Sequence, residues 1–72
     1  MAEGHDRYVE YVLERIRDDR YPSMQLMDRV EAALASREEV RAYLDVLFEK
    51  LDDSRYPSKD MMDRVARLAY LT

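Results

Sequence analysis

A short sequence pattern occurs twice in this chain of 72 residues. Residues 20–23 read RYPS, and the same four letters return at 55–58; in both places MDRV follows after three further residues. With an offset of 35 residues and no gap, nine of the thirteen positions in 18–30 are identical to those in 53–65. Identity this dense predicts two copies of one supersecondary unit, at about 6–35 and 41–71.

Each copy has the hydrophobic pattern of an αα-hairpin. Apolar residues recur at three- and four-residue steps on both sides of the RYPS turn, which is the spacing of one helical face. We therefore expect an all-α fold in which tandem duplicated αα-hairpins form a small four-helix bundle, as one domain over 1–72. The helices are expected at 6–18, 23–35, 37–52 and 58–71. The expected inward residues are Tyr8, Val9, Val12, Leu13, Ile16, Leu26, Met27, Val30, Ala33, Leu34, Tyr43, Leu44, Leu47, Phe48, Leu51, Met61, Met62, Val65, Leu68 and Ala69.

The junction between the two copies admits two arrangements. SREE at 36–39 has the pattern of a capping box, with Ser36 as N-cap and Glu39 three residues later, which predicts two separate helices. Nothing in 35–38 forbids a continuous helix, and a fused rod would need an intertwined dimer to cover its apolar face. At about 100° per residue, the apolar faces before and after the junction differ by roughly 75°, which favours the break.

The repeated turn has the residues of a helix start. In each copy a serine is placed to cap the second helix, and the proline before it cannot continue the first helix. The methionine four residues after the serine can pack against that proline, and the tyrosine before the proline can cover the open end of the core. These residues are Tyr21, Pro22, Ser23 and Met27 in the first copy, and Tyr56, Pro57, Ser58 and Met62 in the second.

The reactive groups needed for catalysis are scarce. The chain has no cysteine and one glycine, and its single histidine, His5, lies in an N-terminus that we expect to fray. A catalytic nucleophile paired with a base, a zinc site and a glycine-rich phosphate loop all lack their usual residues. We therefore expect no enzymatic activity, no cofactor and no bound metal.

The charge balance narrows the class of partner. A net charge of −4 and a pI near 4.9 disfavour direct binding to nucleic acid or to an anionic membrane, because both need clustered Lys and Arg. No apolar run approaches the ~18 residues that a membrane span requires. The N-terminus does not place a basic segment before an apolar one, so we expect a cytoplasmic protein.

Charged and aromatic residues that recur in both copies are the candidate partner-binding residues. The repeated Asp–Arg pairs flank the apolar stripe of each second helix, where two roles are open. They could form salt bridges that lock the turns, Asp28 to Arg20 and Asp63 to Arg55, or they could form the charged rim of an interface. In an up-down-up-down bundle the two RYPS turns would lie together at one end. The candidates are Arg20, Tyr21, Asp28, Arg29, Arg55, Tyr56, Asp63 and Arg64.

These observations favour an interaction module over an enzyme. A chain this short buries little apolar surface by itself, so association with another chain would add stability. We expect a small soluble helical protein–protein interaction or regulatory module that self-associates, as a homodimer, or binds another protein. The alternative is an acidic inhibitor that occupies a basic, nucleic-acid-binding groove of another protein, although ten interspersed arginines weaken it.

Overall fold

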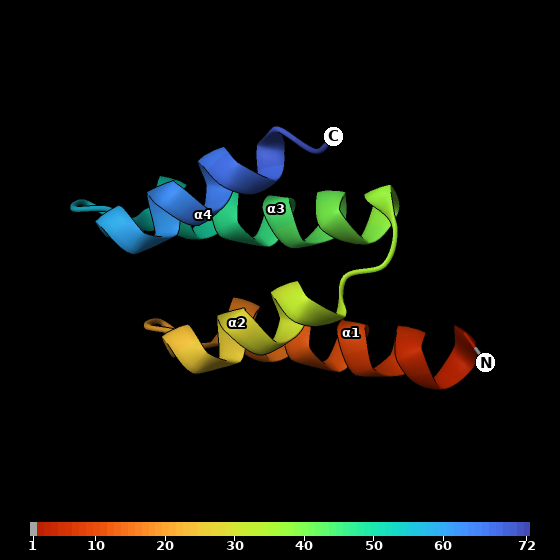
Figure 1. Cartoon of the computed structure of the whole chain (residues 1–72). Helices are drawn as coiled ribbons and strands as arrows, with labels where there is room; N and C mark the ends of the chain where they lie inside the picture. Colours follow the sequence, from red (N-terminus) through yellow and green to blue (C-terminus); the bar gives the residue numbers. More distant parts are fainter. Residues whose placement is uncertain (1) are drawn as a thin grey trace. The chain divides into compact units, whose positions relative to one another are not determined.

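A computed structural model describes residues 2–72, and the secondary structure in that range is helical. The four helices are α1 (Ala2–Asp18), α2 (Met24–Ala33), α3 (Arg37–Asp53) and α4 (Lys59–Ala69). Helix α2 packs alongside α1, and α4 packs alongside α3 (Figure 1). The chain divides into two compact units, Met1–Ala35 and Ser36–Thr72, and each contains one of these αα-hairpins. The predicted all-α fold of tandem hairpins is confirmed.

The three predicted serine caps are present. Ser23, Ser36 and Ser58 each have an extended backbone, and each side-chain oxygen accepts a hydrogen bond from the amide three residues later. The N···O distances are 3.0, 3.1 and 3.0 Å. Each cap satisfies an amide that the helix itself leaves without a partner, and a cap of this type contributes about 1 kcal/mol.

The junction between α2 and α3 is a true break. Helix α2 ends at Ala33, and Leu34 has an extended backbone with φ −64° and ψ 126°. Ser36 is also extended, with φ −142° and ψ 162°, before α3 begins at Arg37. The alternative of one fused helix is therefore wrong, and the capping box correctly predicted where α3 begins.

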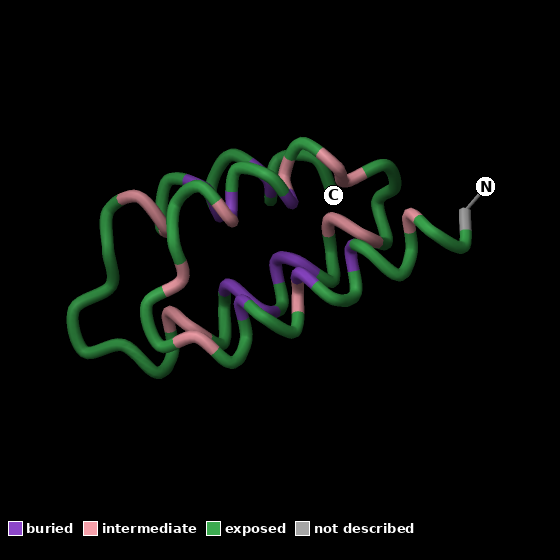
Figure 2. Tube along the Cα trace, turned by 90° about the horizontal axis from the view of Figure 1, so that it is seen from below, coloured by how far each residue is buried: buried purple, intermediate pink, exposed green. Residues whose placement is uncertain are grey.

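The core of the first unit is narrow. Val9, Val12 and Ile16 are buried on α1, at positions i, i+3 and i+7, and Met27 and Val30 are buried on α2. Figure 2 marks such buried positions as short purple bands along the helices. Burying an aliphatic side chain of this size contributes about 1.5–3 kcal/mol, so a few residues carry most of the packing of this hairpin.

The second unit buries a wider arc of its first helix. Tyr43, Leu44, Val46 and Leu47 are all buried on α3, and Val65 and Leu68 are buried on α4. At about 100° per residue, Tyr43 and Val46 lie to one side of the stripe formed by Leu44 and Leu47. Helix α3 therefore has two adjacent buried strips, whereas α1 has one.

Four residues predicted to lie inward are exposed, and the smallest of them is Ala69 on α4. Phe48 has 46% of its surface exposed, although its neighbour Leu47 has none, and Tyr8 and Met62 are also exposed. The hydrophobic pattern includes each of them, yet each lies about 70–120° around its helix from the centre of the buried residues. The predictions for Phe48, Tyr8, Met62 and Ala69 were therefore wrong.

The helix ends differ from those predicted by a few residues. Helix α1 begins at Ala2, so that His5 is helical and half-buried, and the predicted frayed N-terminus and start at residue 6 were wrong. Glu3 lies in the first turn, where a negative charge interacts favourably with the helix dipole and stabilises the helix. Helices α2 and α4 each end two residues earlier than predicted.

Candidate protein-interaction surfaces

The two RYPS turns project their aromatic rings into solvent. Tyr21 and Tyr56 are each 85% exposed, so the prediction that they cover the ends of the cores was wrong. Both lie in the loop between two helices, beyond the last turn of the first one. In the first turn, the guanidinium carbon of Arg20 lies 5.9 Å from the centre of the Tyr21 ring, which is a cation–π distance. Arg55, like Arg20, is exposed.

The repeated aspartates on α2 and α4 are exposed. Asp28 lies on the surface of α2, and Asp63 on that of α4. Asp63 pairs with Lys59, whose Nζ lies 2.9 Å from Asp63 Oδ2, in place of the predicted pair with Arg55. The hydrogen bond and the charge of Asp63 raise the pKa of Lys59 above its usual value of 10.5. Both side chains are largely solvated, so this pair contributes little to stability.

The repeated arginines occupy different environments. Arg29 is exposed, whereas Arg64 is only 5% exposed and its Nε lies 2.7 Å from Asp60 Oδ2. At the position of Asp60, the first unit has Gln25, which has no charge to offer an arginine one turn later. The difference between Asp60 and Gln25 is the sequence signal for a buried arginine, and residues shared by the two copies do not reveal it.

The first unit exposes a strip of aromatic and basic residues. Tyr8, Tyr11 and Arg15 follow one another on α1 at positions i, i+3 and i+7, and all three are exposed. Arg29 on α2 lies on the same side of this hairpin, as the phases of two antiparallel helices require. We call these four residues the Tyr8 surface.

The second unit exposes a strip of a different kind. Asp45, Phe48 and Asp52 on α3 have the same i, i+3, i+7 spacing, and Met62 on α4 lies on the same side of that hairpin. We call these four residues the Phe48 surface. Arg41, one turn before Asp45, and Lys59, one turn before Met62, are exposed at its margin, so this side carries charges of both signs.

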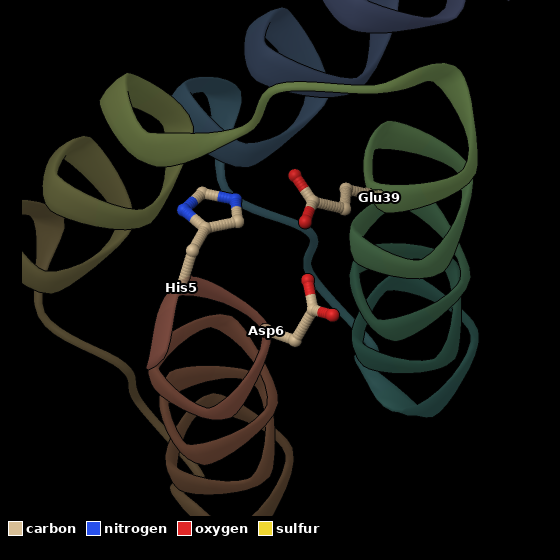
Figure 3. Close-up of side chains that lie close together, drawn as sticks. All are labelled: His5, Asp6 and Glu39. Carbon is tan, nitrogen blue, oxygen red and sulfur yellow. The ribbon is translucent and has the colours of Figure 1, made fainter. Parts of the chain in front are cut away.

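The described residues include three possible metal ligands, from both units. Figure 3 shows His5 and Asp6 near the start of α1 and Glu39 near the start of α3. His5 and Asp6 offer two ligand atoms from one unit, and Glu39 belongs to the other. Protein sites for a metal such as zinc use three or four ligands in a fixed arrangement. Within residues 2–72, neither unit by itself brings three such side chains together, and we assign no metal site.

Comparisons with known proteins do not identify this chain. No family model, no curated protein and no solved structure matches it. In the part of the chain that the structure describes, no helix combines the length and the hydrophobicity needed to cross a membrane.

Proposed function

We propose that this protein works through protein–protein contact and that it associates with further copies of itself. The observation that carries this proposal is the exposure of its aromatic residues. Five of the six tyrosines and the one phenylalanine are exposed. Tyrosine, phenylalanine, methionine and arginine are enriched in interfaces. A tyrosine ring also supplies a large contact area at a small cost in conformational entropy.

The arrangement of these residues supports the proposal further. Tyr8 and Tyr11 lie one turn apart on α1, and helix phase puts Phe48 and Met62 on the same side of the second hairpin. Neighbouring exposed apolar residues of this size typically mark a contact surface, whereas scattered ones do not. Arginine beside tyrosine, as in the Tyr8 surface, is the composition of the residues that contribute most to binding in many interfaces. We propose the cytoplasm as the place where this contact occurs.

Sedimentation equilibrium over a range of micromolar concentrations tests the proposal. We expect the average mass to rise from the 8.6 kDa of one chain toward at least twice that value as concentration increases. Tyr11→Ser should weaken the association, because it removes an aromatic ring from the Tyr8 surface. Tyr70→Ser is the matched control, because Tyr70 is 93% exposed and lies beyond the end of α4. This variant should associate like the wild type.

A strictly monomeric wild type at every concentration would contradict self-association. Equal weakening by Tyr11→Ser and Tyr70→Ser would also count against a specific surface, because it would show that any exposed tyrosine has the same effect.

A further inference from the structure

We draw no further inference here: the strongest candidate, the exposed apolar strip of Phe48 and Met62 on one side of the second hairpin, has charges of both signs around it, and nothing in the structure, which describes residues 2–72, shows what covers it.

Discussion

Replacing Leu47 by alanine should destabilise the fold by about 2–5 kcal/mol. Leu47 is fully buried on α3, in the stripe that packs between α3 and α4. Truncation removes its contacts and leaves a cavity that the hairpin can only partly fill. A small domain has a total stability at the low end of about 5–15 kcal/mol, and each kcal/mol shifts its melting temperature by about 4–8 °C. Thermal unfolding followed by circular dichroism should therefore show a loss of more than about 10 °C, or no cooperative transition.

Phe48→Ala is the matched control for Leu47→Ala. Phe48 is the next residue on the same helix and carries a larger side chain, yet it is exposed. We expect its truncation to cost less than about 1 kcal/mol when unfolding is measured at a concentration low enough to keep the chain monomeric. A Leu47→Ala variant that melts within a degree or two of the wild type, or a Phe48→Ala variant that is the less stable of the two, would refute the helix phase described for α3.

Replacing Asp60 by alanine should destabilise the second unit by about 2 kcal/mol. The change removes the carboxylate that lies 2.7 Å from the buried guanidinium of Arg64. Asp60 is itself partly exposed, so water can reach the vacated position and the cost stays below that of a fully buried ion pair. Chemical unfolding should show a lower midpoint with an unchanged slope.

A double-mutant cycle separates the ion pair from the other effects of the Asp60→Ala change. In an Arg64→Met background the buried charge is gone, and Asp60→Ala should cost less than about 0.5 kcal/mol. Gln25→Ala at the corresponding position of the first unit is the matched control and should also be nearly neutral, because Arg29 is exposed. An equal loss from Asp60→Ala in both backgrounds would show that the carboxylate does not stabilise Arg64.

The sequence predicted the hairpins because their signals are local. A serine at the start of an apolar-periodic segment can cap only the helix that follows it, and Ser23, Ser36 and Ser58 all do so. The break before α3 was predicted on the same grounds, since a capping box and a change of apolar phase both point to it. Periodicity likewise identified Val12 and Leu47 as core residues, because they lie near the centre of their stripes.

The sequence did not predict which edge of each apolar stripe is buried. Tyr8 and Tyr43 are the same residue at corresponding positions, yet the first is exposed and the second is buried. Periodicity gives the centre of a helical face but not its width, and the width depends on what packs against it. In the second unit Val46 is buried at one edge of the stripe, while Phe48 and Met62 at the other edge are exposed.

The candidate site was predicted only in part, for a related reason. The predicted partner-binding residues are identical in the two halves, and the structure leaves Tyr21 and Tyr56 exposed while it buries Arg64. The two proposed interaction surfaces depend instead on how the halves differ. Val46 stands in place of Tyr11 and Phe48 in place of Leu13, and these differences have meaning only once burial is known. That the two RYPS turns form a composite binding end stays a prediction.

Backbone amide chemical shifts followed over a dilution series test association through these surfaces. We expect the amides of the Tyr8 surface and of the Phe48 surface to shift as the chain associates, while those around buried Val46 and half-buried Leu13 stay nearly constant. The two RYPS turns should also stay constant. Shifts confined to the turns around Tyr21 and Tyr56, or spread evenly over both sides of each hairpin, would contradict this expectation.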